Sequence, residues 1–297
     1  MISLLLATRA DLICAVTAAA LSVVGSGIII LLNVRFKEYR DNFFRSLIFI
    51  LSIYDAIISF SFMIPGSVGK AFCKFQGYFI VYSALMPVFI SLCIAIITYL
   101  NVVRRWTKKQ LKTLFKKMHI ICNVLALGIM FFSILFADSV SFPNTNWCFI
   151  KGQEMLGTFY ITIWICTIIS FILYLLIVKK IREIYKELDG LVDIGDKSRK
   201  TENLKVQFRM STIPLSLIFT WLIASIRRTR EIFWENPKQI NTLNILQSLT
   251  NPMQGLFDCF VFVIFSSYSR KKVKELICCA ESEKEKYPPE IDSDSKL

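Results

Sequence analysis

The sequence predicts an all-α membrane protein: a seven-transmembrane helix bundle followed by a short amphipathic helix. Three observations carry this prediction. Seven long apolar stretches hold almost no charge, 55% of the 297 residues are hydrophobic with a mean hydropathy of +0.54, and the basic residues alternate between rich and poor connecting segments. A helix needs about 20 apolar residues to cross a hydrocarbon core about 30 Å thick. Lipid cannot satisfy backbone polar groups, so each stretch is expected to be helical.

Each span is defined by the charges that flank it. Five stretches carry no charged residue: Asp11 to Arg35, Lys74 to Arg104, Lys117 to Asp138, Glu154 to Lys179, and Arg209 to Arg227. Two others each contain a single acid: Ser46–Gly66 with Asp55, and Thr242–Phe265 with Asp258. The first run is too long for the apolar region of a cleavable signal peptide and lacks a basic segment before it, so it is expected to remain as a signal anchor.

The basic residues predict the orientation of the chain. Segments 34–45, 101–117, 179–209 and 266–297 contain four, seven, nine and seven Lys or Arg, which is 27 of the 35 present. Because basic residues favour the cytoplasmic side, the N-terminus is expected outside and the C-terminus inside. The net charge of +13 therefore indicates topology and attraction to anionic membrane lipids, and nucleic acid is not expected as a partner.

The chain divides into four expected parts. Residues 1–11 form a short extracellular N-terminus, 12–265 the receptor-like bundle, 266–279 an amphipathic helix on the membrane surface, and 280–297 a disordered cytoplasmic tail rich in Pro, Glu and Ser. Cys278 and Cys279 end the amphipathic helix, where palmitoylation would anchor it. The alternative is a pair of unmodified cytosolic thiols.

Two of the nine cysteines lie outside the predicted spans on the extracellular side. Cys73 precedes the third span, and Cys148 lies in the second outer loop beside Trp147 and Phe149. Disulfides persist in an oxidising compartment, so a bridge between Cys73 and Cys148 is expected to hold this loop over the bundle. The alternative is two free exposed thiols.

Polar residues at mid-membrane depth predict a functional cluster. Asp55 lies in the middle of the second span, and a carboxyl group there should face the bundle interior. Asn251 and Pro252 lie at a similar depth in the seventh span, followed by Asp258. Because Pro252 removes a backbone hydrogen bond, the helix is expected to kink there. These residues are interpreted as a switch that rearranges when helices move; the alternative is static hydrogen bonding between helices.

Further candidates surround an expected cavity. Pro214 and Trp221 in the sixth span would form a hinge with a bulky side chain, and Pro87 in the third span offers another bend. Gln76 and Gln247 are polar candidates for the cavity wall. Three arginines at the outer rim are candidates for pairing with a phosphate, with a solvated or headgroup-binding rim as the alternative: Arg227, Arg228 and Arg230.

Several functions need residues that the chain lacks. Residues 242–265 contain no Lys for a retinal Schiff base, and the single histidine, His119, cannot supply the ligand cluster of a zinc hydrolase. No glycine loop for phosphates is visible, and the surroundings of Asp55 and Asp258 lack the glycine pattern of intramembrane aspartyl proteases. No enzyme activity, cofactor or metal is therefore expected.

Several motifs resemble those of the cyclic-AMP-receptor-like G-protein-coupled receptors, over roughly residues 12–277. They are the string 51–55 ending in Asp55, Cys73 with Gln76, the string 147–150, and Asn251-Pro252-Met253-Gln254-Gly255 followed by Asp258. The resemblance separates the chain from rhodopsin-like receptors, which usually show Asp-Arg-Tyr after span three and Asn-Pro-x-x-Tyr in span seven. Here span three ends in the string 101–106, and the second motif lacks its Tyr.

The resemblance implies a plasma-membrane receptor that activates a heterotrimeric G protein. The ligand would be small and extracellular and would bind within the bundle, with cyclic AMP as one candidate. Spans three, five, six and seven would bound the site, and the basic inner loops would meet the G protein. The alternatives are a small-solute transporter or channel and a non-signalling membrane scaffold. A transporter would more often show an internal repeat, and none is evident.

Overall fold

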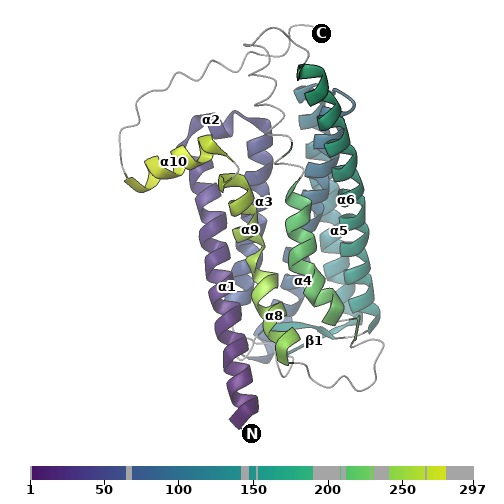
Figure 1. The fold of residues 1–297 in the computed structure, drawn as a ribbon. Coiled ribbons are helices and arrows are strands. Elements are labelled where there is room, and N and C mark those ends of the chain that lie inside the picture. The colour runs from purple at the N-terminus through teal and green to yellow at the C-terminus, as the bar shows by residue number, and fades with distance from the viewer. Residues whose placement is uncertain are drawn as a thin grey trace.

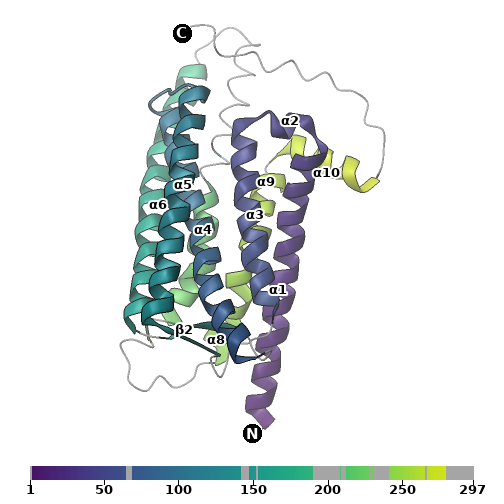
Figure 2. The ribbon, with the colours of Figure 1, turned by 180° about the vertical axis from the view of Figure 1, so that it is seen from behind.

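The protein is an elongated bundle of near-parallel helices in a computed structural model (Figure 1). The structure describes residues 2–64, 69–141, 147–151, 153–189, 208, 212–227, 229–230, 241–264 and 266–278. The two strands β1 (Asp138–Ser141) and β2 (Cys148–Lys151) form a hairpin at one end, together with the start of α1 (Ile2–Arg35). The short helices α2 (Lys37–Arg40) and α10 (Ser267–Cys278) lie at the other end (Figures 1 and 2).

The helices follow the apolar stretches of the sequence. Their bounds are α1 Ile2–Arg35, α2 Lys37–Arg40, α3 Phe43–Met63, α4 Lys70–Val102, α5 Lys108–Phe136, α6 Gln153–Asp189, the unlabelled helix Thr212–Arg227, α8 Asn241–Thr250, α9 Gln254–Ile264 and α10 Ser267–Cys278. Five of them are long and apolar enough to cross a membrane. The shorter apolar helix Thr212–Arg227 occupies the sixth predicted stretch, and α8 with α9 occupies the seventh, so the predicted seven-helix bundle is confirmed.

Two details concern the ends and the continuity of the spans. Helix α1 begins at Ile2, so the residues expected as a short extracellular N-terminus are helical and continuous with the first span. Helix α4 continues through Pro87 as one element from Lys70 to Val102, without a break at that position. A buried span with packed neighbours tolerates a proline because surrounding groups can satisfy the freed backbone carbonyl.

Helix α4 forms the centre of the bundle. It packs against α3, α5 and α6 and against both strands of the hairpin. In its most apolar window 83% of the residues are buried, against 17% in the corresponding window of α5. Helix α5 therefore lies at the edge, where side chains such as Leu135 and Phe136 are exposed toward the expected position of lipid.

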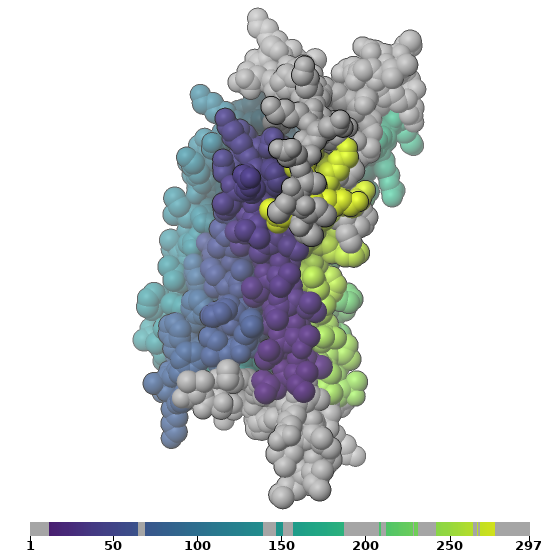
Figure 3. All heavy atoms as spheres, turned by 90° about the vertical axis from the view of Figure 1, so that its left-hand side faces the viewer, coloured from purple at the N-terminus to yellow at the C-terminus, as the bar shows by residue number. Residues whose placement is uncertain are grey.

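The other half of the bundle is built around α1, which packs against α3, α8 and α9. Figure 3 shows α1 on one face, with α3 to one side of it and the segments of span seven to the other. A Cβ atom built on Gly25 would lie 2.9 Å from the Gly255 carbonyl oxygen. The two glycines therefore allow α1 and α9 to approach more closely than larger side chains would permit.

The second outer loop contains a small sheet that the all-α prediction did not include. Strands β1 (Asp138–Ser141) and β2 (Cys148–Lys151) pair antiparallel, with Ser141 opposite Cys148 and Asp138 opposite Lys151. Both strands lie against α4. The loop is consequently a fixed cap across one end of the bundle, at least for its described residues.

At the opposite end, α10 turns away from span seven. The segments Thr242–Val263 and Tyr268–Leu276 are related by an angle of 113°. The Arg45 guanidinium lies 4.7 Å from the ring centroid of Tyr39 and 4.6 Å from that of Tyr268. The Tyr39 hydroxyl donates to Ser269 Oγ at 3.0 Å. This arrangement, which we call the tyrosine clamp (Tyr39, Arg45, Tyr268 and Ser269), fixes α10 against α2 and the start of α3.

Candidate functional site

Two buried carboxyl groups form the centre of the candidate site. Asp55 on α3 has 0% of its surface exposed, and Asp258 on α9 has 1%. The two side chains are close enough to interact with one another. Within the described part of the chain neither carboxyl group forms an ion pair, and ionised carboxyl groups can only accept hydrogen bonds. A proton held by either group would supply the donor that such a pair requires.

The sixth span is tied to this pair by one short hydrogen bond. The Ser216 hydroxyl donates to Asp258 Oδ1 at 2.6 Å, and Ser216 also lies 2.7 Å from the Ile213 carbonyl oxygen. Ser216 belongs to the helix Thr212–Arg227, whose first turn contains Pro214. The residues immediately before this helix, 209–211, lie outside the described residues, so the expected bend at Pro214 stays a prediction.

The seventh span is interrupted at the predicted motif. Asn251–Met253 form a 3₁₀ turn between α8 and α9, with Pro252 within it. The Ser59 hydroxyl lies 3.2 Å from the Pro252 carbonyl oxygen and 2.8 Å from Ser22 Oγ. The backbone N–H of Gly255 donates to Ser22 Oγ at 3.0 Å. Hydroxyl groups from α1 and α3 thus satisfy backbone groups where the α-helical pattern is broken.

Several polar atoms of the same region are buried without a hydrogen-bond partner among the described residues. They are Ser26 Oγ, both carboxyl oxygens of Asp55, Ser248 Oγ, Asn251 Oδ1, Gln254 Nε2 and Asp258 Oδ2. Each such atom costs about 1–3 kcal/mol when buried unpaired. We define the intramembrane polar cluster as Ser22, Ser26, Asp55, Ser59, Ser216, Asn251, Gln254 and Asp258. It joins α1, α3, the helix Thr212–Arg227 and span seven.

The predicted outer residues are brought together only in part. The Arg227 guanidinium donates to Gln247 Oε1 at 2.8 Å, so the ends of spans six and seven are joined there. Gln247 is 3% exposed, whereas Arg230 is half-buried. Arg228 lies outside the described residues. The arginine rim is consequently not a row of free cations, since Arg227 already has a polar partner.

The structure joins Cys73 and Cys148 by a disulfide, at a Cα–Cα distance of 5.2 Å. Gln76 lies one turn along α4 and ties three backbone segments together. Its amide nitrogen donates to the carbonyl oxygens of Ser61 (3.0 Å) and Ile64 (2.7 Å), and its oxygen accepts from the Cys148 N–H (3.1 Å). Gln76 was a candidate for the cavity wall, which stays a prediction; in the structure its amide connects α3, α4 and β2.

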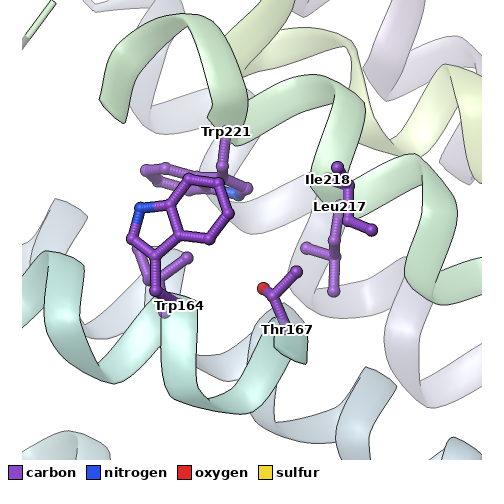
Figure 4. Close-up of a pocket in the computed structure, with 6 residues that line it drawn as sticks. Trp164, Thr167, Leu217, Ile218 and Trp221 are labelled. Carbon is purple, nitrogen blue, oxygen red and sulfur yellow. The ribbon is translucent and has the colours of Figure 1, made fainter. Parts of the chain in front are cut away.

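Aromatic side chains link the outer hairpin to the sixth span. Phe149 on β2 contacts Phe159 edge-on at 5.5 Å between ring centroids, and Phe159 contacts Trp221 in the same way at 5.8 Å. Trp221 also lines a shallow groove between α6 and the helix Thr212–Arg227, with Trp164 and Thr167 on its other wall (Figure 4). The side chains fill this groove almost completely, so it leaves no room for a small-molecule ligand in this arrangement.

A second polar group lies between α3, α4 and α5 and was not selected from the sequence. Asn123 Oδ1 accepts from the Tyr82 hydroxyl at 2.9 Å, and the Tyr54 hydroxyl lies 3.5 Å from both Asn123 Oδ1 and His119 Nε2. His119, the single histidine of the chain, contacts Tyr54 with its ring. The spacing of His119 and Asn123, one helical turn apart, was a signal for a shared face.

The two lipidation candidates lie at the end of α10. Cys278 is the last residue of that helix, and Cys279 lies outside the described residues. An acyl chain on Cys278 would therefore be attached at the C-terminal end of α10.

Three features together define a seven-helix receptor. They are the seven-helix bundle, the hairpin bonded to the N-terminal end of α4, and the buried polar cluster beside the break at Pro252. Residues 27–263 match the family model described as "7 transmembrane receptor (rhodopsin family)". The chain therefore belongs to this family of receptors.

Individual relatives agree with this membership. The chain is 29% identical to "G-protein coupled receptor 1" of Arabidopsis thaliana over 265 residues, which cover 85% of this chain and 77% of the relative. It is 23% identical to "G-protein coupled receptor 157" of Mus musculus, covering 94% and 89%. The structure resembles that of squid rhodopsin with a TM-score of 0.72 and 14% identity, over 95% and 89% of the two chains, which shows a common fold.

The comparisons broaden the family that the sequence motifs suggested. The matching model is that of the rhodopsin family, so the separation from rhodopsin-like receptors is not upheld. The more specific resemblance to the cyclic-AMP-receptor-like group is not confirmed. Receptors of this family are integral to the plasma membrane and cross it several times, as the apolar helices of this chain require.

Proposed function

We propose that this chain is a plasma-membrane receptor that binds a small extracellular ligand within its helix bundle and activates a heterotrimeric G protein. The N-terminus and hairpin face outward, and α10 lies along the cytoplasmic surface. The distribution of Lys and Arg supports this orientation. The disulfide-bonded hairpin at the opposite end from α10 suits an oxidising exterior.

The observation that carries the proposal is the intramembrane polar cluster around the Asn251-Pro252 break. It contains atoms from spans one, two and seven that have no hydrogen-bond partner among the described residues, at about 1–3 kcal/mol for each unpaired group. Two conformations of a receptor usually differ by only a few kcal/mol. A small movement of span six or seven that gives Asn251 or Gln254 a new partner would therefore change the population of the two states.

The ligand is proposed to reach this cluster from the hairpin end. Cyclic AMP is the first compound to test, because it combines a phosphate that suits a guanidinium group with an adenine that suits aromatic side chains. Arg227 is a described arginine that contacts a buried residue of span seven, Gln247. It could bind a phosphate by exchanging its contact with Gln247, which would release the ends of spans six and seven from each other.

The cytoplasmic side is proposed to meet the G protein and the lipids. The basic inner segments provide positive charge for both partners, although most of the segment 179–209 lies outside the described residues. Arg270, Lys271 and Lys274 on α10 are exposed and suit anionic headgroups. Palmitoylation of Cys278 and Cys279 would strengthen that attachment, because stable anchoring of a lipidated segment takes two signals.

Guanine-nucleotide exchange tests the proposal. Membranes that display the full chain at the cell surface are combined with purified heterotrimeric G protein, with and without extracellular cyclic AMP. Stimulated exchange that is lost in Asn251→Ala and kept in Thr162→Ala supports the proposal and identifies the ligand. Thr162 is a suitable control because its exposed hydroxyl bonds only to its own helix, at Thr158 O.

The other outcomes also decide between hypotheses. Raised basal exchange without a response to cyclic AMP keeps the receptor function and discards this ligand. No exchange with any G-protein subtype, despite surface expression, would contradict the proposal and favour a transporter or channel. Flux of a small solute into vesicles, abolished by Asp55→Ala, would then be the measurement to make.

A further inference from the structure

Three thiols from three neighbouring helices meet inside the bundle, apart from the polar cluster. Cys93 on α4 is 1% exposed, Cys122 on α5 is half-buried, and Cys166 on α6 is 7% exposed. The Cys93 and Cys122 sulfur atoms are 3.6 Å apart, and Cys166 is near enough to interact with both. Within the described part of the chain, no group of three or more His, Cys, Asp or Glu residues is placed to hold a metal ion. The arrangement is a thiol pair with a third thiol beside it.

The thiol pair lies in the cytoplasmic half of the bundle. Cys93 precedes Val102, the last residue of α4, by nine residues, which is about 14 Å along a helix. Cys122 follows the basic residue Lys117 by five positions on α5. The disulfide of Cys73 lies at the outer end of the same α4, so a link at Cys93 would fix this helix at a second and distant point.

The distance between the two sulfur atoms is short enough for bond formation by side-chain movement. A disulfide bond is about 2.05 Å long, so the sulfurs must approach by roughly 1.6 Å. Each thiol turns about its Cα–Cβ bond, and the two helices already pack against one another. The close sulfur contact described for this group is the one between Cys93 and Cys122, so Cys166 is the weaker competitor for either partner.

We propose that Cys93 and Cys122 are a site of oxidative modification, at which a lipid hydroperoxide closes a disulfide between α4 and α5. The half-buried Cys122 sulfur attacks the hydroperoxide and becomes a sulfenic acid, while the hydroperoxide is reduced to an alcohol. The Cys93 sulfur then attacks the sulfenic sulfur, and the hydroxyl leaves as water with the Cys93 proton. Two thiols and one hydroperoxide thus give one disulfide, one alcohol and one water molecule.

The surface around Cys122 favours a membrane-dissolved oxidant over a water-soluble one. Its neighbours Ile121, Val124 and Leu125 on α5 are 57%, 63% and 51% exposed. Apolar side chains exposed at this depth face acyl chains, which are where lipid hydroperoxides arise. Cys122 is half-buried, whereas Cys93 is 1% exposed. Cys122 is therefore the sulfur that an oxidant in the membrane can reach, and it is expected to react first.

Thiol counting in the full chain tests the proposal. The purified protein is placed in phosphatidylcholine vesicles, treated with cumene hydroperoxide, denatured without reduction and labelled with a maleimide polymer that shifts its gel mobility. The wild-type chain is expected to take up two labels fewer after oxidation. After digestion with trypsin, mass spectrometry should then show peptide 75–104 linked through Cys93 to Cys122 of peptide 118–151. That peptide also carries peptide 71–74 through the Cys73–Cys148 bridge, so the product is lighter by four hydrogen atoms than the three separate reduced peptides.

Matched variants assign the bond. Cys166→Ser should still lose two labels, whereas Cys93→Ser and Cys122→Ser should lose none to an intramolecular link. Cys93 is buried, so Cys93→Ser could fail to fold. In that case Cys122→Ser still tests which cysteines form the bond. An unchanged label count in the wild type, a linked peptide that contains Cys166, or a link between two copies of the chain would each overturn the proposal. Since the readout needs no ligand or G protein, it is independent of the receptor assay.

Discussion

At the scale of single residues, Gln76 shows how a side-chain amide can replace missing secondary structure. Its two ends satisfy carbonyl groups at the end of α3 and an N–H group of β2. These groups lie at or near the ends of α3 and β2, where regular backbone hydrogen bonding stops. Gln76 therefore stabilises the same loop that the neighbouring disulfide holds covalently.

Replacing Gln76 by Leu should lower the thermal stability of the purified protein. Leucine preserves much of the side-chain volume but leaves buried backbone groups without partners, at a total of about 2–4 kcal/mol. Thermal unfolding in detergent, followed by thiol exposure at Cys93, measures the change. Gln110→Leu, at the exposed cap of α5, serves as the control and should cost less. Equal losses in the two variants would show that the Gln76 contacts are not stabilising.

Tyr39 makes the tyrosine clamp sensitive to alkaline pH. Burial raises the pKa of the Tyr39 hydroxyl above its ordinary value of 10.0, although its hydrogen bond with Ser269 and the charge of Arg45 act in the opposite direction. The unfolded chain then releases this proton at a lower pH than the folded chain. The contribution is fully present below about pH 10 and is lost as the pH rises toward the folded pKa.

Tyr39→Phe should therefore remove part of the loss of stability above about pH 10. Below that pH the variant should be less stable by about 1 kcal/mol, because it lacks the hydrogen bond to Ser269. Unfolding temperatures of the wild type and variant, measured between neutral and alkaline pH, give both values. Parallel pH profiles for the two proteins would contradict the assigned pKa of Tyr39.

At the scale of elements, the sequence predicted the positions of the helices. It predicted few of the contacts between residues that are far apart in the chain. Apolar runs with at most one acidic residue located every span, and the kink expected at Pro252 falls where a 3₁₀ turn separates α8 from α9. The hairpin was missed because its register depends on packing against α4. The contacts of Asp55 with Asp258, and of Ser216 with Asp258, needed the relative rotation of three helices, which no single apolar stretch specifies.

The close contact between α1 and α9 gives a physical reason for the glycine that ends the motif 251–255. Gly255 follows the Asn251-Pro252 break, and an added Cβ atom there would clash with Ser26 Oγ and lie 3.1 Å from the Asp55 Cβ. The glycine therefore brings the polar groups of α1 and α3 directly against span seven.

Gly255→Ala should destabilise the protein, because overpacking of a filled interior typically costs about 1–3 kcal/mol. It should also disturb the Gly255 N–H bond to Ser22 and alter basal nucleotide exchange. The matched control is Gly27→Ala, since nothing lies within 4 Å of an added Cβ at Gly27. Alanine at Gly27 is expected to be neutral or slightly stabilising in a helix. Similar melting temperatures for both variants would argue against a close α1–α9 contact.

At the scale of the whole molecule, covalent and noncovalent contacts hold the hairpin end while the opposite end depends on packing. The Cys73–Cys148 bridge spans 75 residues of sequence and joins the hairpin to α4. The tyrosine clamp at the other end is held by ring contacts and hydrogen bonds alone. The two ends should therefore respond differently to reducing agents.

Cys73→Ser, Cys148→Ser and the double variant should lose similar amounts of stability, about 2–4 kcal/mol, because each removes the same bridge. Reduction of the wild type should reproduce the loss, while Cys14→Ser should melt like the parent. Fluorescence-detected thermal unfolding of surface-expressed receptor gives the comparison. Additive losses from the two single variants would mean that the cysteines stabilise the fold separately and not as a bridge.

The contrast between α4 and α5 has a consequence for how this molecule responds to membrane composition. Helix α4 touches protein on nearly every side, so changes in acyl-chain length reach it only through its neighbours. Helices α5 and α6 present Phe, Leu and Ile side chains outward along much of their length and must match the thickness of the bilayer themselves. A thinner or thicker membrane would therefore change the tilt of α5 and α6 relative to α4.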